Sequence, residues 1–109
     1  MINNKKIILV TSGDPAGIGP DICLDIVRHN FSDKYKIVVI GSVEVLQQRA
    51  KLLNRQLLIK KIDDLAIDCK AGVLPVLNVE CADKVIPGIV NPNNSPYVLK
   101  TLDLAISLC

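Results

Sequence analysis

At 109 residues the chain has the length of one small domain, and its hydrophobic content of 50% is ample for a packed core. Aromatic residues make up only 3%, while isoleucine, leucine and valine abound, which favours an α/β fold of buried strands covered by helices over an aromatic-rich sandwich. The formal net charge of +2 is spread along the chain and gives no basic footprint for nucleic acid or an anionic membrane.

The first half of the chain alternates strand and helix patterns. Apolar runs predict strands at about 6–11 and 36–40, and apolar stripes predict helices at about 19–30 and 42–53. This order indicates parallel strands with a right-handed crossover and helices that cover the sheet. Cys23 falls on the first helical stripe, where we expect it as a small core residue.

Two short strands and a long loop are expected next. Leu57–Ile59 and Val73–Leu77 have strand patterns, and Pro75 places the second at an edge or a strand end. Residues 78–94 show no periodicity and contain strong turn signals. A loop of this length usually serves a site or an interface.

A final helix is predicted with Asn94 or Ser95 as its N-cap and Pro96 in its first turn. Its predicted apolar positions are Val98, Leu102, Ala105, Ile106 and Cys109. They run to the last residue without a capping signal, so we expect a chain that is cut short. The alternative is a natural end that frays.

Cysteine and histidine usage argues against a metal site within the chain. Cys23, Cys69, Cys81 and Cys109 lie far apart, without the close pairs of zinc or redox centres, which predicts reduced thiols in a cytosolic protein. His29, the only histidine, falls near a helix end, where it suits the negative end of the dipole better than catalysis. No stretch has the length of a membrane span or the h-region of a signal peptide.

The densest turn chemistry, TSGDPAGIGPD, lies at Thr11–Asp21, between the first strand and the first helix. Gly13, Gly17 and Gly19 allow close approach of a ligand or of another backbone, and such a loop can present amides to a phosphate or carboxylate. The dinucleotide fingerprint fails, because Ile22 stands where a third small residue belongs, and the P-loop ending is missing. A tight turn without a ligand is the alternative.

Two polar features leave their role open. Asp14 either orients a substrate or cofactor group or bonds the amides of its own turn. The segment Asn91–Tyr97 offers polar side chains to a ligand or a neighbouring subunit, although turn and cap chemistry accounts for most of them.

Taken together, Thr11–Ile22 and Gly88–Leu102 resemble the 4-hydroxythreonine-4-phosphate dehydrogenase family of pyridoxal phosphate biosynthesis. The first segment is similar to that family's Gly-Asp/Glu-Pro-Ala-Gly-Ile-Gly-Pro-Glu opening, which itself resembles the opening of isocitrate and isopropylmalate dehydrogenases. The likeness spans essentially the whole chain. Ser12 and Asp21 depart from the family's usual proline and glutamate, and neither change removes a catalytic group.

The resemblance implies a three-layer α/β/α, isocitrate/isopropylmalate dehydrogenase-like enzyme of two domains, active as a homodimer in the cytoplasm. Residues 1–109 would be its amino-terminal part, an incomplete first domain that is inactive alone. The family oxidises 4-phosphooxy-threonine with NAD or NADP to a β-keto acid that decarboxylates, aided by a divalent metal. The metal-binding histidines belong to later segments, so no catalytic or metal-binding residue is mapped here.

The cofactor contacts that the analogy predicts are Gly13, Asp14, Gly17, Ile18 and Gly19. Two other classes of function stay open. The chain could be a stand-alone, non-catalytic module that holds a phosphate or nucleotide on its glycine loop, or a structural subunit that pairs with a separately encoded remainder. A reading frame that continues past Cys109 into a histidine-containing part favours the enzyme, and a stop codon there favours the module.

Overall fold

The structure, a computed structural model, describes residues 6–26, 35–66 and 72–109. Within them, one parallel sheet comprises β1 (Lys6–Thr11), β2 (Tyr35–Gly41), β3 (Leu58–Ile62) and β4 (Val73–Asn78). The helices are α1 (Gly19–Ile26), α2 (Val43–Leu52) and α3 (Ser95–Leu108), with a short 3-10 helix, η1 (Pro92–Asn94), before α3. His29, Cys69 and the end of the predicted first helix lie outside the described residues.

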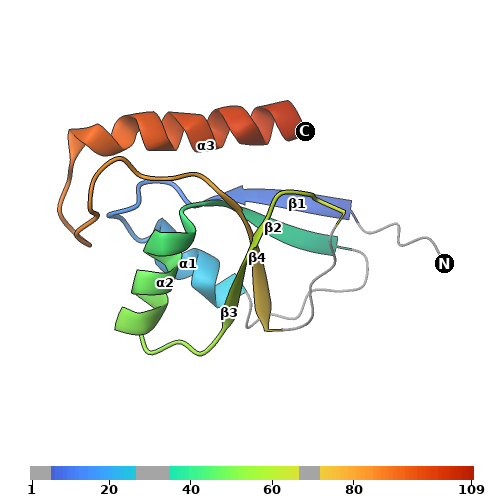
Figure 1. The fold of residues 1–109 in the computed structure, drawn as a ribbon, viewed down its shortest axis with the longest axis horizontal. Helices are drawn as coiled ribbons and strands as arrows, with labels where there is room; N and C mark the ends of the chain where they lie inside the picture. The colour runs from blue at the N-terminus through green and yellow to red at the C-terminus, as the bar shows by residue number, and fades with distance from the viewer. Residues whose placement is uncertain (1–5, 27–34, 67–71) are drawn as a thin grey trace.

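The strand order is β1-β2-β4-β3 (Figure 1). The connection through α1 therefore joins the neighbouring strands β1 and β2, whereas the connection through α2 joins β2 to β3, with β4 between them in the sheet. The βαβα order predicted for the first half is confirmed, and each element lies close to its expected bounds. Because the strands are parallel, the carboxyl ends of β1 and β2 meet at one edge of the sheet. Ligands of such sheets bind at that edge.

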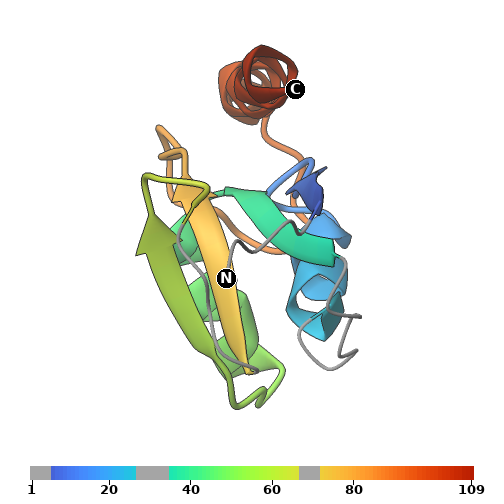
Figure 2. The ribbon, with the colours of Figure 1, turned by 90° about the vertical axis from the view of Figure 1, so that its right-hand side faces the viewer.

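Helices cover both faces of the sheet, with α1 and α2 on one side and α3 on the other (Figure 2). The alternation along β2 divides the core between the two sides. Val39 packs in the cluster with α1 and α2, whereas Val38 and Ile40 pack in the cluster with α3. All three side chains are fully buried, as expected of a parallel strand covered on both faces. The predicted three-layer α/β/α architecture is confirmed.

The expectation for Pro75 is wrong, because β4 lies inside the sheet, between β2 and β3. Pro75 is buried and stands opposite Lys60 in the pairing with β3. The pairing of β4 with β2 begins only at Val76, one residue beyond the proline. Pro75 therefore precedes the first paired residue of β4 on the β2 side, so its missing N–H removes no hydrogen bond from the β2–β4 ladder. This position allows an inner strand to contain a proline.

The predicted apolar stripe of α3 is partly wrong. Val98 and Ala105 pack against the core, but Leu102 is 43% and Ile106 is 73% exposed, and Cys109 is exposed as well. The buried side is instead centred on Tyr97 and Thr101. Both hydroxyl groups are hydrogen-bonded. The Tyr97 hydroxyl bonds to Ser12 and Ser42, and the Thr101 hydroxyl donates to the carbonyl oxygen of Val98. Satisfied hydroxyls cost little to bury, so the helix turns this face inward.

The connection over residues 79–91 contains neither helix nor strand, as its turn signals predict. The buried side chains of Val79 and Val85 anchor it to the core. Cys23 lies in the core as predicted, at 2% exposure. In the part of the chain that the structure describes, the cysteines are free thiols, and no helix is long and apolar enough to cross a membrane.

Candidate functional site

The glycine loop leaves β1 as a tight turn. Gly13 has a φ of +72°, a left-handed conformation that glycine adopts without strain. The N–H of Gly17 donates to the carbonyl oxygen of Asp14 at 3.0 Å, and the N–H of Ala16 donates to Oδ1 of Asp14 at 2.9 Å. Of the two roles open for Asp14, the structure therefore shows the bonding of its own turn. These bonds also occupy two of the amides that the sequence suggested for an anion.

Gly19 is required by a close approach between two backbones. A Cβ atom at this position would overlap the carbonyl oxygen of Ser12, so any larger residue would push α1 away from the end of β1. At Gly17 the added Cβ would meet the carbonyl oxygen of Asp14 at 3.4 Å, which is ordinary contact. The two glycines thus have different roles, and Gly19 is the one that brings the helix against the strand.

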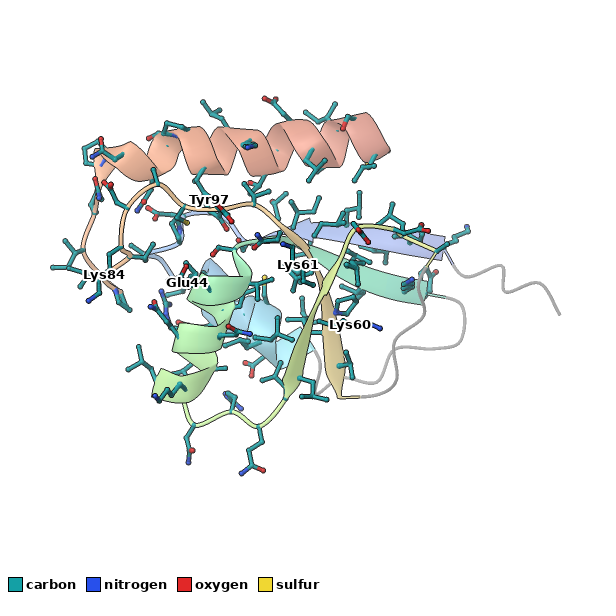
Figure 3. The ribbon with its side chains drawn as sticks, in the orientation of Figure 1. Glu44, Lys60, Lys61, Lys84 and Tyr97 are labelled. Carbon is teal, nitrogen blue, oxygen red and sulfur yellow. The ribbon has the colours of Figure 1, made fainter. Side chains whose placement is uncertain are left out.

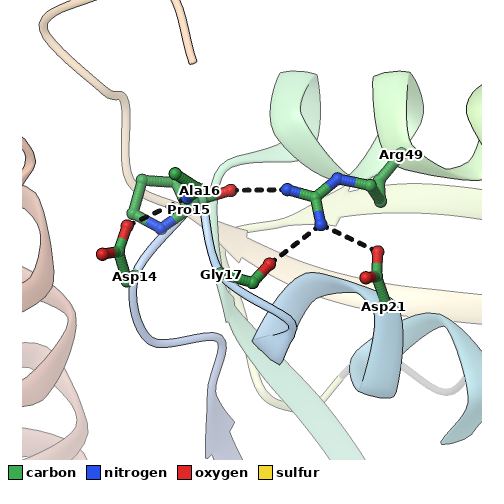
Figure 4. A network of polar contacts seen from close by, with 6 residues as sticks. All are labelled: Asp14, Pro15, Ala16, Gly17, Asp21 and Arg49. Atoms are coloured by element: carbon green, nitrogen blue, oxygen red, sulfur yellow. Dashed lines mark hydrogen bonds and ion pairs between the residues drawn. The ribbon is translucent and has the colours of Figure 1, made fainter. Parts of the chain in front are cut away.

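Arg49 of α2 holds the back of the glycine loop (Figure 4). Its guanidinium donates to the carbonyl oxygens of Pro15 at 2.8 Å and Gly17 at 2.9 Å, and to Oδ1 of Asp21 at 2.9 Å. Arg49 is only 5% exposed, so a buried cation and three acceptors lock the turn against α2. This role of Arg49 was not predicted from the sequence. The available signal was its spacing of three residues from Leu46, which places it on the apolar stripe of the helix.

A second polar junction ties α3 to the sheet. Tyr97 points from α3 toward the strand ends (Figure 3). Its hydroxyl accepts a hydrogen bond from the N–H of Ser42 at 2.8 Å and lies 3.0 Å from Oγ of Ser12. Burial raises the pKa of Tyr97, so the phenol stays protonated. The start of α3 is therefore joined to the loops that follow β1 and β2.

A cavity of about 450 Å³ lies between the glycine loop and the start of α3. Its lining residues are Asp14, Val90, Asn91, Pro92, Asn94, Ser95, Val98 and Leu99. This volume is within the range of small-molecule sites, and the mixture of apolar walls with a few polar groups is typical of them. The Asn91 side chain is used locally, since it accepts from the N–H of Asn93.

Asn94 has an unusual environment in this cavity. It is 4% exposed and takes the N-cap position of α3, yet its side chain makes no capping bond. Within the described residues its Oδ1 is buried and has no hydrogen-bond partner. An unsatisfied buried acceptor costs roughly 1–3 kcal/mol, which a fold ordinarily avoids. Turn and cap chemistry therefore explains the side chain of Asn91, but it leaves Oδ1 of Asn94 without a partner within the described residues.

A smaller cavity of about 330 Å³ lies beside the start of α2, bordered by Glu44 and Lys84 (Figure 3). Its thiol, Cys81, has a pKa raised mainly by burial and is therefore protonated near neutrality. This cavity offers no activated nucleophile. Across the described ranges, moreover, no three His, Cys, Asp or Glu side chains are grouped so that they could hold a metal ion.

The chain has relatives of similar sequence among known proteins. No family model matches the chain. It is 37% identical to the 4-hydroxythreonine-4-phosphate dehydrogenase of Neisseria meningitidis serogroup A over 103 residues, which cover 94% of this chain and 31% of that protein. It is 39% identical to the enzyme of the same name from Vibrio parahaemolyticus over 109 residues, covering 98% of this chain and 32% of that protein.

The chain is related to the 4-hydroxythreonine-4-phosphate dehydrogenases. It spans about a third of the length of these relatives. The solved structure of such a dehydrogenase from Burkholderia phymatum aligns with 97% of the chain at a TM-score of 0.86 and 19% identity. The Klebsiella pneumoniae enzyme aligns with 95% of the chain at a TM-score of 0.83 and 25% identity. The chain covers 33% of each of these structures, so its layers correspond to about a third of those folds.

The two segments that resemble the dehydrogenase family lie side by side in the structure. The N–H of Gly88 donates to the carbonyl oxygen of Ala16 at 2.8 Å, and Tyr97 contacts Ser12. Of the five predicted cofactor contacts, Asp14 lines the larger cavity. The side chain of Ile18 is 73% exposed. The remaining three are the glycines that shape the turn.

Proposed function

We propose that residues 1–109 are the amino-terminal part of an NAD- or NADP-dependent 4-hydroxythreonine-4-phosphate dehydrogenase, an oxidoreductase of pyridoxal phosphate biosynthesis. The proposal has one main support: the two motifs that resemble this family meet around one cavity, at the carboxyl end of β1. Relatives at 37–39% identity bear this enzyme's name. The fragment alone is inactive in this proposal, because the second domain is supplied by sequence beyond it.

The reaction is the oxidation of the secondary hydroxyl of 4-phosphooxy-threonine to a β-keto acid, which then loses carbon dioxide. NAD or NADP, when bound, accepts the hydride. A divalent metal would polarise the reacting oxygen. The described residues do not fit such a metal, since they contain no group of three or more ligands. The metal is therefore assigned to residues other than those described, and none of its chemistry is assigned to the residues described.

The residues of this chain fit a contact with the cofactor. Gly13, Asp14, Gly17, Ile18 and Gly19 form the proposed contact surface. Asp14 uses Oδ1 in its own turn, which leaves Oδ2 for a ligand hydroxyl. Asn94 lies in the lining of the same cavity, and a hydrogen bond to a ligand would satisfy its Oδ1, which has no partner within the described residues.

The complete enzyme is proposed to be a cytoplasmic homodimer that acts on a small phosphorylated hydroxy-amino acid, without nucleic acid or membrane partners. A stand-alone, non-catalytic nucleotide- or phosphate-binding module is the second candidate. One observation favours it: the glycine loop and the lining of the cavity are both supplied by residues of this chain.

One experiment separates the two candidates. The complete reading frame that contains these residues is expressed and assayed with 4-phosphooxy-threonine and either NAD or NADP, with and without a chelator. The dehydrogenase predicts substrate-dependent formation of reduced cofactor that the chelator abolishes. Nucleotide binding without any reduction, or a stop codon after Cys109, would favour the module instead.

A further inference from the structure

The guanidinium of Arg49 lies behind the glycine loop, on the side where α2 packs (Figure 4). We propose that Arg49 is a positioning residue for nucleotide binding, which holds the loop in the conformation that meets the cofactor. This inference rests on the proposed function, because only there is the loop a cofactor contact.

Burial makes the interaction between Arg49 and the loop obligatory. A guanidinium at 5% exposure has lost most of its water, which is costly unless its charge and its donors are satisfied. The carboxylate of Asp21 pairs the charge, and the carbonyl oxygens of Pro15 and Gly17 take further donors. All three acceptors belong to the loop or to the first turn of α1. A loop that moved away would leave a buried cation unpaired, so Arg49 restricts the loop to this conformation.

The contact with Gly17 also sets the direction of the next amide. In a trans peptide the C=O and the following N–H point in opposite directions. Because the carbonyl of Gly17 points at Arg49, the N–H of Ile18 points away from it. The amides of Ala16 and Gly17 bond to Asp14, whereas that of Ile18 has no acceptor among the described residues. Arg49 thus leaves a free donor on the outer side of the loop.

Arg49 acts through the loop and makes no contact of its own with the cavity. Figure 4 shows it approaching from α2, while Asp14 lies on the side of the loop that faces α3. Asp14 lines the larger cavity and Arg49 does not. Removal of Arg49 should therefore weaken nucleotide binding without direct loss of a ligand contact.

The test uses the protein from the complete reading frame, with Arg49→Met, Arg49→Lys and the control Arg55→Met. Arg55 is a matched control because it is also an arginine in an ion pair, with Asp25 at 3.1 Å. This pair is partly exposed and does not involve the glycine loop. We expect Arg49→Met to raise the KM for NAD or NADP about tenfold, equivalent to ~1.4 kcal/mol, with the KM for 4-phosphooxy-threonine changed less than about twofold. Arg49→Lys keeps the charge but loses the planar fork, so an intermediate rise is expected. Arg55→Met should change neither KM.

An unchanged nucleotide KM in both Arg49 variants would overturn the inference. So would an equal rise of both KM values, which would mean that Arg49 supports only the fold. If Arg49→Met does not fold, the KM for nucleotide and the KM for 4-phosphooxy-threonine are compared in Arg49→Lys and Asp21→Asn instead. Nucleotide dissociation constants from titration give a second readout that needs no turnover. If the unsubstituted protein binds nucleotide but catalyses no reaction, and Arg49→Met binds it more weakly, the inference about Arg49 stands and the proposed dehydrogenase function is rejected. If the unsubstituted protein binds no nucleotide, both are rejected.

Discussion

The hydroxyl of Tyr97 lies 3.0 Å from Oγ of Ser12, although the two residues are 85 positions apart in the chain. The same hydroxyl accepts from the N–H of Ser42, so a single oxygen joins the loops after β1 and β2 to α3. Removal of the oxygen would leave the buried N–H of Ser42 without its acceptor and the buried Oγ of Ser12 without this partner. This junction holds the cavity in shape, because the start of α3 forms one of its walls.

Tyr97→Phe should lower the free energy of unfolding by about 1–3 kcal/mol, because the N–H of Ser42 loses its acceptor inside the protein. Urea unfolding of the protein from the complete reading frame measures the change. Tyr35→Phe is the control, since Tyr35 is 43% exposed, and its effect should stay within about 0.5 kcal/mol. Equal effects of the two substitutions would contradict the role given to the Tyr97 hydroxyl.

Gly19→Ala should lower the free energy of unfolding by about 1–3 kcal/mol, because the new methyl group overlaps the carbonyl oxygen of Ser12. Overpacked sites have costs of about this size. Gly17→Ala, in the same loop, should cost less than about 1 kcal/mol, because its Cβ would make only ordinary contact. Thermal unfolding of both variants makes the comparison. A larger loss at position 17 than at position 19 would show that the backbones do not approach as described.

Asn94→Ala should leave the free energy of unfolding unchanged or raise it by up to about 1–3 kcal/mol, since the side chain gives α3 no capping bond and the substitution removes a buried oxygen that has no partner within the described residues. The same substitution should raise the KM for NAD or NADP several-fold if Asn94 meets the ligand in the cavity. The two measurements are unfolding and steady-state kinetics on one preparation. A loss of more than ~2 kcal/mol with an unchanged KM would assign Asn94 to structure instead, at the upper end of cap effects.

Cys23 should resist alkylation in the native protein and react after unfolding. Burial raises the pKa of its thiol from 9.0 to about 11, so little thiolate forms at pH 8. The folded pKa lies above the unfolded one, so the contribution of this group to stability is present below pH 9 and is lost as the pH rises toward 11. Mass spectrometry after iodoacetamide treatment, with and without urea, tests the first point. Rapid native labelling of Cys23 would mean that the core under α1 opens.

Local patterns were sufficient for most of the architecture. The solid apolar run of β2 and the helical stripes on either side of it predicted the parallel sheet, and the glycines and prolines at positions 13–20 predicted the turn between β1 and α1. These signals depend on a residue and its near neighbours, so they can be read without a fold. The resemblance to the dehydrogenase family rests on the same local motifs.

Other features depended on partners that are distant in sequence. Whether Arg49 is solvated or buried is decided by the carbonyls of a loop more than thirty residues earlier. The face of α3 that packs inward is decided by Ser12 and Ser42, which satisfy the Tyr97 hydroxyl. The sequence by itself thus determined the strands, the helices and the place of the glycine loop. Only the tertiary structure decided which polar groups are buried, because burial of a polar group depends on an acceptor or donor that another element must supply.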